Sequence, residues 1–320
     1  TKKWLYKKVE STSPWAAFVS LVSPHYPLTC PEDYFNMYNP DEIDLPIGYG
    51  ERVLPTHSEL KNIKDFYNYD QYFDEKKMRE AKVAYYGLTS FMDDCVGKIL
   101  DALEASGQAK NTVVLYISDH GDMLGDQGFW TKQVMYEQSA GVPMVISGPG
   151  VPKGRTIETG TSLIDLASTA IEVTGVDDCE YSQGLPGFSL RKLANSDDDI
   201  DRTILSEYHD GGSTTGTFMI RWQNWKYVHY VGHPPQLFNL KKDPDELADL
   251  VTMRPNDPSI TQILEEGERR LRKICDPEAV NEKCFADQTA KIKSLGGEEA
   301  CLNAFRFNHT PTPSEQEKLF

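Results

Sequence analysis

The stretch YISDHGDMLGDQGFWTKQ, residues 116–133, places an acid, an imidazole and an ammonium close together in the chain. Asp119 and His120 directly follow an apolar run at 112–118, and Gly121 lets the backbone turn away sharply. A carboxylate is a hard oxygen ligand suited to calcium, magnesium or manganese, and an imidazole nitrogen shifts the preference toward manganese or zinc without excluding calcium. Two adjacent ligands cannot hold a catalytic ion alone, and the alternative interpretation is a strand-end turn with an Asx hydrogen bond.

Two further residues extend this candidate site. Lys132 lies in a polar, aromatic loop, and His25 follows a second apolar run at 15–22. If both runs are strands of one parallel sheet, His25 and His120 lie at the same edge, where α/β proteins bind their ligands. An ion and an ammonium would offset negative charge there, and an imidazole would donate a proton to a leaving oxygen, which suits hydrolysis of an anionic ester. The alternatives are a surface lysine and a hydrogen-bonded structural histidine.

Hydrophobic patterning predicts the elements that position these residues. Fully apolar runs predict strands at 15–22, 112–118 and 142–147, and apolar residues spaced three and four apart predict helices at 74–106 and 162–174. The chain between the first strand and the first helix is predicted to be a long ordered loop. Strand–helix–strand order with apolar strands predicts an α/β fold with a mostly parallel sheet covered on both faces.

The character of the sequence changes after an acidic linker, NSDDDIDR. Turn residues separate four short runs that predict a small antiparallel sheet, at 203–208, 217–222, 226–231 and 236–240. A helix at about 260–274 and a tail with two short helical segments follow. We therefore divide the chain into residues 1–200 and residues 201–320. His209, in the glycine-rich stretch EYHDGGSTTGTF, is a weaker candidate for a substrate-binding residue.

Composition limits the classes of partner. The net charge is -16, and an acidic surface repels phosphate backbones, so nucleic acid is not an expected partner. No apolar stretch is long enough for a membrane helix. Cys275, Cys284 and Cys301 cluster near the C-terminus, where a disulfide is one open alternative. The chain starts at Thr1 without methionine, and we expect it to be the later part of a longer protein.

The stretch SDHGDMLGDQGFWTKQVMYEQSAGVPMVISGPG resembles the second metal half-site of the sulfatases in the alkaline phosphatase superfamily. Those proteins share a strand, Asp-His or Asp-Asn, Gly, a downstream Lys and then VP-apolar-apolar-x-GPG. SLVSPHYPL is similar to the family's strand ending in a catalytic histidine, and WKYVHYVGHPPQLFNLKKDPDELADL resembles its C-terminal subdomain. DPEAVNEKCFADQTAKIKSLGGEEA is similar to the tails of choline-sulfatase-like members. The resemblance covers nearly the whole chain.

This resemblance implies a fold and a set of roles. The expected fold is part of an alkaline-phosphatase-like sandwich with a mostly parallel central sheet, followed by a small antiparallel-sheet subdomain and a helical tail. Asp119 and His120 would be ligands of a divalent metal, with calcium expected and manganese as the alternative. Lys132 would contact a sulfate oxygen, and His25 would be the acid for the leaving group or a sulfate contact.

One part of the family's machinery is missing from the sequence. The family's nucleophile is a formylglycine made from Cys or Ser in C/S-x-P-x-R, and the run from Cys30 through Asp33, CPED, does not fit that motif. The family's two other metal-binding Asp residues, which precede that motif, are absent too. We therefore expect formylglycine to lie in a missing N-terminal part and this chain alone to be inactive.

We expect the complete protein to be a sulfatase that hydrolyses a small-molecule or carbohydrate sulfate ester. One rival is a phosphonate monoester or phosphodiester hydrolase of the same superfamily, with which His120 is compatible. A second is a non-catalytic protein that binds a sulfated ligand. The tail after Pro277 is a candidate oligomerisation arm, by analogy alone.

Overall fold

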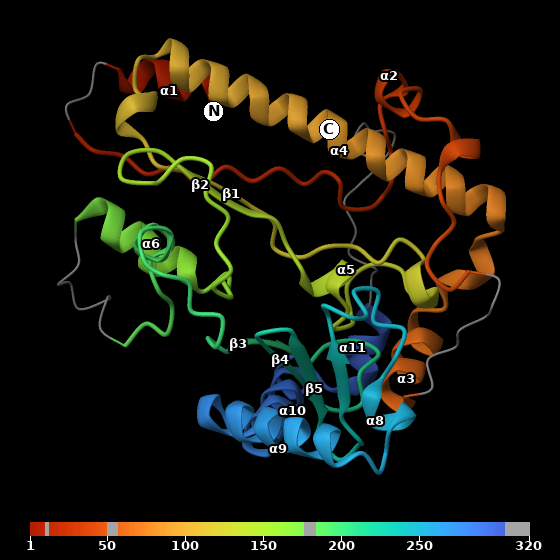
Figure 1. Ribbon diagram of the computed structural model, residues 1–320. Coiled ribbons are helices and arrows are strands. Elements are labelled where there is room, and N and C mark those ends of the chain that lie inside the picture. The colour runs from red at the N-terminus through yellow and green to blue at the C-terminus, as the bar shows by residue number, and fades with distance from the viewer. Residues whose placement is uncertain (10–12, 50–56, 176–183, 305–320) are drawn as a thin grey trace.

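The computed structural model of the protein describes residues 1–9, 13–49, 57–175 and 184–304 (Figure 1). Its longest element is helix α4 (Glu75–Ala105), which confirms the helix predicted at 74–106. The side chain of Asp74 accepts a hydrogen bond from the backbone N–H of Lys77 and caps the helix N-terminus. Helices α1 (Lys2–Lys8) and α2 (Glu32–Phe35) pack against α4. The end of the predicted second domain, residues 305–320, lies outside the described residues.

Strands β1 (Val114–Ile117) and β2 (Met144–Ser147) form where strands were predicted, but the predicted parallel sheet is wrong for the described residues. The two strands are antiparallel, with Val114 opposite Ser147 and Ile117 opposite Met144. A parallel pair needs a connection that crosses back over the sheet. Here residues 118–143 form turns and the short helix α5 (Glu137–Ala140), which return the chain in the opposite direction. Apolar composition indicated the strands but carried no information about their direction.

The strand predicted at 15–22 is also wrong. The segment has no regular secondary structure, and no described strand pairs with it. It runs below α4 as an extended chain (Figure 1), and its apolar side chains are largely exposed, Phe18 to 90% and Val22 to 58%. Trp15 at its start is the exception, because its ring packs edge-on against Trp4 with the centroids 5.2 Å apart.

The region predicted as one long loop contains short helices instead. The largest is α3 (Ser58–Tyr67), preceded by the 3-10 helix η1 (Pro40–Glu42) and followed by η2 (Tyr69–Tyr72). Leu60 and Ile63 lie on its buried face. The side chain of His57 accepts the backbone N–H of Glu59 and caps the helix. The abundance of Pro, Asn and Asp around these elements obscured the short helical repeat of α3.

The antiparallel sheet predicted in the second part of the chain is confirmed, whereas the first helix of the tail, with 18 residues, is longer than the short segment predicted. Strands β3 (Ile204–Tyr208), β4 (Thr217–Trp222), β5 (Trp225–Tyr230) and β6 (Gln236–Asn239) form an antiparallel sheet in sequence order. Helix α9 (Pro258–Ile274) covers one face, and it packs so closely that a Cβ on Gly267 would lie 2.8 Å from the ring of Tyr227. Helices α10 (Pro277–Ser294) and α11 (Glu298–Ala304) form the tail, and the short α8 (Leu250–Met253) follows β6.

Among the described residues between β2 and the small sheet, two further helices are present. Helix α6 (Asp165–Thr174) confirms the helix predicted at 162–174, and it ends at Gly175, which has a positive φ of 73°. Helix α7 (Leu190–Ala194) packs against α6. The buried carboxylate of Asp165 receives two hydrogen bonds from the guanidinium of Arg202, at 2.7 and 2.9 Å. This ion pair joins the start of α6 to the chain that leads into β3.

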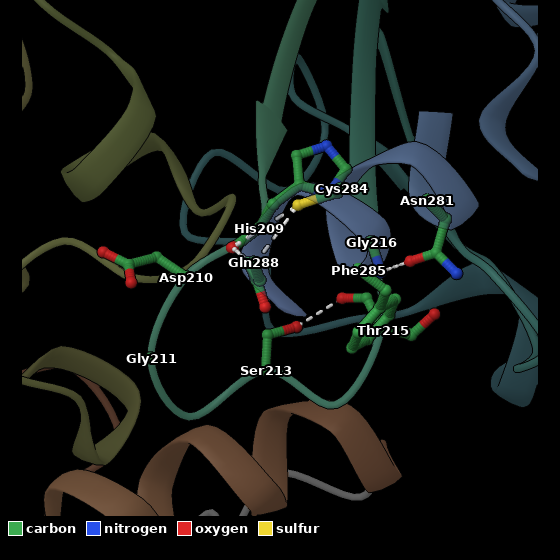
Figure 2. A pocket seen from close by; sticks show the side chains of 10 residues that line it. All are labelled: His209, Asp210, Gly211, Ser213, Thr215, Gly216, Asn281, Cys284, Phe285 and Gln288. Carbon is green, nitrogen blue, oxygen red and sulfur yellow. Dashed lines mark hydrogen bonds between the residues drawn. The ribbon is translucent and has the colours of Figure 1, made fainter. Parts of the chain in front are cut away.

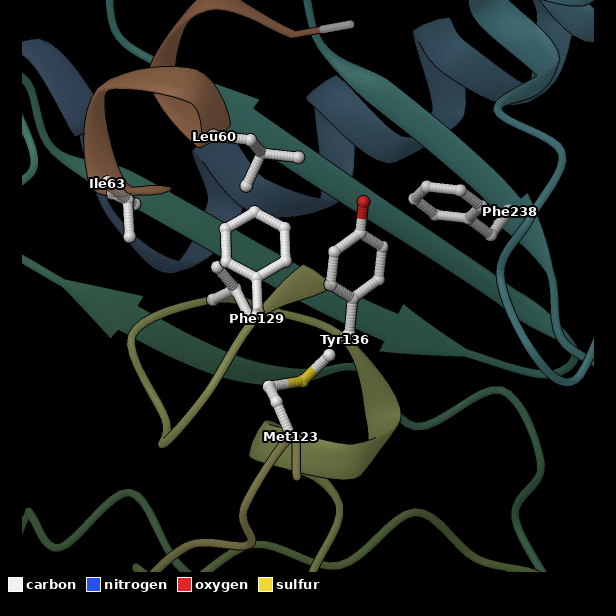
Figure 3. Close-up of a cluster of buried hydrophobic side chains, with 7 residues drawn as sticks. Leu60, Ile63, Met123, Phe129, Tyr136 and Phe238 are labelled. Atoms are coloured by element: carbon white, nitrogen blue, oxygen red, sulfur yellow. The ribbon is translucent and has the colours of Figure 1, made fainter. Parts of the chain in front are cut away.

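A hydrophobic cluster joins the loop that follows β1 to the rest of the protein (Figure 3). Met123, Phe129, Val134 and Tyr136 of the loop pack with Leu60 and Ile63 of α3 and with Phe238 of β6. Each of these side chains is at least nine-tenths buried. The residues between β1 and α5 are therefore held by a core contributed by distant parts of the sequence.

Two statements from composition are tested by the structure. Cys275, Cys284 and Cys301 all carry free thiols, so none of the three is in a disulfide. Among the described helices, none combines the length and the apolar character that crossing a membrane requires.

Candidate functional site

The turn after β1 presents Asp119 and His120 together. The backbone N–H of His120 donates to Asp119 Oδ1 at 3.1 Å, and the hydroxyl of Ser118 donates to the carbonyl of His120 at 2.8 Å. His120 Nδ1 lies 2.8 Å from the carbonyl of Gly121, which can only accept, so Nδ1 carries the proton. His120 Nε2 is therefore the nitrogen with the free lone pair, and it lies 3.5 Å from Asp119 Oδ2.

This donor pair fits a divalent cation. Metal–ligand bonds of about 2.0–2.6 Å would allow one ion to lie between an oxygen and a nitrogen at this separation. The bond from Nδ1 to a backbone carbonyl is the kind of outer contact that fixes a metal-binding imidazole. Within the described residues, no third His, Cys, Asp or Glu joins the pair in an arrangement that could hold a metal. The complete coordination of a catalytic ion would need further ligands.

Gly121 follows the pair at a point of close backbone approach. Its N–H donates to the carbonyl of Ser139 at 2.8 Å. A Cβ at this position would lie 2.0 Å from the carbonyl oxygen of Gln138, which is far inside van der Waals contact. Only glycine therefore lets the turn lie directly on α5.

Lys132 and His25 meet beside this turn. Lys132 Nζ lies 2.8 Å from His25 Nε2, and His25 Nδ1 lies 2.6 Å from the carbonyl of Tyr26. Because that carbonyl can only accept, His25 Nδ1 carries a proton and Nε2 accepts from the ammonium. The rings of His25 and His120 are 6.0 Å apart between centroids. The structure thus gathers His25, His120 and Lys132, although not at the edge of a parallel sheet.

The electrostatic environment of Lys132 is mixed. Partial burial lowers the pKa of Lys132, and the carboxylates of Asp119 and Asp122 act in the opposite direction. Tyr26 stacks on His25 with the centroids 4.2 Å apart, and Lys132 Nζ lies 5.8 Å from the Tyr26 ring. A partly desolvated ammonium binds an anion more strongly than a fully solvated one would.

The backbone that carries Lys132 is fixed by local hydrogen bonds. Asp122 Oδ1 accepts from the N–H groups of Leu124 and Thr131, at 3.0 and 3.1 Å. The hydroxyl of Ser139, in α5, donates to the carbonyl of Lys132 at 2.8 Å. Sequence reasoning missed Tyr26 and Ser139. Tyr26 could have been found because it adjoins His25, whereas the contact of Ser139 depends on the return of the chain through α5.

His209 lies in a different setting from the other candidates (Figure 2). It lines a cavity of about 350 Å³ between the 209–216 turn and α10. Its ring lies edge-on to Phe218 with the centroids 5.1 Å apart, and its Nε2 lies 3.5 Å from Glu207. Within the described part of the chain, none of its hydrogen bonds, ion pairs or ring contacts reaches Asp119, His120 or Lys132. The role of His209 in binding substrate therefore stays a prediction.

Two family models match the chain. The model described as Sulfatase matches residues 1–176, and the model described as N-sulphoglucosamine sulphohydrolase, C-terminal, matches residues 125–275. Choline-sulfatase of Rhizobium meliloti is 33% identical over 249 residues, covering 75% of this chain and 47% of that protein. Arylsulfatase K of Danio rerio is 32% identical over 250 residues, covering 73% and 46%. The chain thus spans about half the length of the curated relatives it matches.

Solved structures show the same fold. Phosphonate monoester hydrolase from Silicibacter pomeroyi superimposes with a TM-score of 0.65 at 23% identity, covering 78% of this chain and 53% of that one. The phosphonate monoester hydrolase of Agrobacterium radiobacter gives 0.66 at 23% identity, covering 85% and 58%. A putative sulfatase from Bacteroides fragilis gives 0.65 at 20% identity, covering 85% and 56%. The described residues therefore adopt part of the alkaline-phosphatase-like sulfatase fold.

Proposed function

Because this chain belongs to the sulfatase family, we propose that the complete protein hydrolyses a sulfate monoester to an alcohol and inorganic sulfate. The observation that carries the proposal is the contact of 2.8 Å between Lys132 Nζ and His25 Nε2, beside Asp119 and His120. An ammonium and an imidazole at this distance can bind two neighbouring oxygens of one ester. The family and the relatives support a sulfate ester as the substrate.

Each residue has a definite task in this proposal. Lys132 binds a non-bridging sulfate oxygen and offsets the charge that grows there in the transition state. His25, protonated on Nε2 when the ester is bound, donates that proton to the departing alcohol oxygen. The bond from His25 Nδ1 to the Tyr26 carbonyl keeps Nε2 facing the ester. Lys132 is partly buried, with its Nζ 5.8 Å from the centroid of the Tyr26 ring.

Asp119 and His120 would hold a divalent metal through Oδ2 and Nε2, and calcium is the ion we expect, with manganese as the alternative. When bound, such an ion withdraws charge from sulfate oxygens and polarises the attacking group. The sequence contains no C/S-x-P-x-R motif, so we place the formylglycine nucleophile outside these residues. The four side chains here would then form one half of the complete site.

A phosphonate monoester hydrolase is the second candidate. Two such enzymes share the fold, with TM-scores of 0.65 and 0.66, and a tetrahedral phosphonate ester suits the same ammonium and imidazole. The alcohol part of the substrate is open between a small molecule and a carbohydrate. A choline-sulfatase is among the relatives, and one structural neighbour is a complex with D-glucosamine-2-N,6-O-disulfate.

Turnover by the complete protein tests the proposal. We expect an aryl sulfate to be hydrolysed with a higher kcat/KM than the matching aryl phosphonate, and the reverse order would favour the second candidate. Lys132→Ala and His25→Ala should each reduce kcat/KM by about 100-fold or more, as expected for a lost charge contact or general acid. Lys153→Ala, on an exposed turn, is the control and should be neutral.

Two results would contradict the proposal. Full activity of both Lys132→Ala and His25→Ala would remove these residues from the reaction. Binding of sulfate esters without any turnover would instead favour a non-catalytic protein that retains sulfated ligands.

A further inference from the structure

Helix α5 connects the two halves of the candidate site. The carbonyl of Ser139 accepts the N–H of Gly121, and the hydroxyl of Ser139 donates to the carbonyl of Lys132, both at 2.8 Å. Ser139 is only 2% exposed, so water does not compete for these bonds. Any shift of α5 therefore moves the Asp-His-Gly turn and Lys132 together.

The N-terminus of α5 is held by a buried ion cluster that comes from the small sheet. Lys226, on β5, is fully buried, and its Nζ lies 2.8 Å from each of three oxygens: Glu137 Oε1, Glu246 Oε1 and the carbonyl of Met135. The second oxygen of Glu246 accepts the backbone N–H of Glu137 at 2.6 Å. The contact with the Met135 carbonyl is a hydrogen bond, and the contacts with the two carboxylates are ion pairs, so Lys226 binds both the segment that leads into α5 and its anchor.

Lys226 and Arg221 offset the charges of Glu137 and Glu246. Of these side chains, Lys226 and Glu246 are fully buried, and Glu137 and Arg221 are partly exposed. Burial raises the pKa of Glu246, and Lys226 opposes that rise. Burial acts in the same direction on Glu137, but Lys226 and Arg221 outweigh it and lower the pKa of this carboxyl. Arg221 Nη1 lies 3.3 Å from Glu137 Oε2. Burying such a cluster gains little stability over apolar packing, but it fixes the orientation of the first turn of α5 and its distance from β5.

We infer that Lys226 is a positioning residue for the candidate site, a role that rests on the proposed function. Lys226 fixes Glu137 at the first turn of α5, and Ser139 on the same turn fixes Gly121 and Lys132. Helix α5 lies between the β1–β2 pair and the small sheet (Figure 1). The small sheet thus sets the separation between the ammonium of Lys132 and the Asp119–His120 pair.

The test replaces Lys226 by Met in the complete protein, which keeps the length of the side chain and removes its charge. Arg202→Met is the matched control, because Arg202 also pairs with a fully buried carboxylate, that of Asp165, and has no described contact with α5. The readout is hydrogen exchange of the Gly121 amide, compared with amides of α4, at a temperature where both variants are folded. This readout needs no turnover, so it is separate from the test of sulfatase activity.

We expect Lys226→Met to lower the protection of Gly121 by roughly tenfold or more relative to α4, and Arg202→Met to leave that ratio unchanged. The kcat/KM for an aryl sulfate should fall by about 100-fold in Lys226→Met, as for a misplaced reacting group, and by much less in Arg202→Met. Should Lys226→Met fail to fold, Glu246→Gln takes its place. This variant leaves Lys226 paired with Glu137, and it should lower the protection of Gly121 relative to α4 by less than about tenfold.

Unchanged protection of Gly121 in the folded variant would overturn the inference. An equal loss in Arg202→Met would overturn it too, because the effect would then be general destabilisation. If Gly121 responds as expected but no variant and no wild type hydrolyses sulfate esters, the positioning contact stands and the proposed reaction fails.

Discussion

Among the described glycines, Gly121 is the one at which an added Cβ would approach another atom most closely, so we develop the substitution Gly121→Ala first. The new Cβ would lie 2.0 Å from the carbonyl oxygen of Gln138 and 3.1 Å from its carbon. To reach an ordinary contact of 3.4 Å, the turn and α5 must separate by about 1.4 Å, because repulsion rises steeply at shorter distances. Both neighbours are backbone, so no flexible side chain can move aside.

Two quantities should change. The separation breaks the bond of 2.8 Å from the Gly121 N–H to the carbonyl of Ser139, and with the overpacking we expect a loss of about 2–4 kcal/mol in the free energy of unfolding. The same movement displaces Asp119 and His120 from Lys132 by about 1 Å, which should lower kcat/KM by about 100-fold.

The assay measures denaturant unfolding and aryl sulfate turnover on the complete protein. Gly97→Ala is the matched control, because Gly97 lies inside α4 and a Cβ there meets nothing within 4 Å. That variant should be stabilised by up to about 1 kcal/mol, since alanine favours a helix, and its activity should not change. Wild-type stability and turnover in Gly121→Ala would refute the reasoning about close approach.

Two further predictions concern the metal and the buried loop. Calcium should raise the melting temperature of the complete protein increasingly as its concentration exceeds Kd, and a chelator should reverse the rise. Asp119→Ala should abolish this response. A full response to calcium in that variant would show that Asp119 is not a ligand. Burial raises the pKa of Asp126, whose carboxylate accepts the N–H of Ile47. Because the folded state then disfavours the charged form, wild type loses stability as pH rises above the unfolded pKa. Asp126→Asn should therefore unfold at a higher denaturant concentration than wild type at pH 7, and the difference between the two midpoints should shrink toward pH 3. A difference that grows in acid would mean that folding lowers the pKa of Asp126.

Local sequence pattern was enough for the elements that depend on neighbouring residues. The spacing of apolar residues predicted α4, and the turn residues between short runs predicted β4 and β5. The relative direction of β1 and β2 was predicted wrongly, because the pairing of Val114 with Ser147 depends on how the chain between them turns. Apolar composition at Phe18 predicted burial, yet burial depends on what packs there, and Phe18 is exposed.

In the candidate site, too, local sequence predicted some residues, and contacts between distant parts of the chain determined the others. Asp119, His120 and Lys132 were visible because their residue types and order are distinctive. The sequence placed His25 near Lys132 by assuming a parallel sheet, which the described residues do not form. The family resemblance pointed to the same two residues. Lys226 could not have been found, because a lysine on a strand usually faces solvent, and only the fold shows that its ammonium lies among buried oxygens.

The central claim is that Lys132 and His25 together hold a sulfate ester beside Asp119 and His120. A crystal structure of the complete protein with calcium and a slowly hydrolysed sulfate ester tests it most directly. The account predicts a sulfate oxygen within hydrogen-bond distance of Lys132 Nζ, the bridging oxygen next to His25 Nε2, and the ion on Asp119 and His120. An ester bound elsewhere, with Lys132 Nζ still resting on His25, would contradict it.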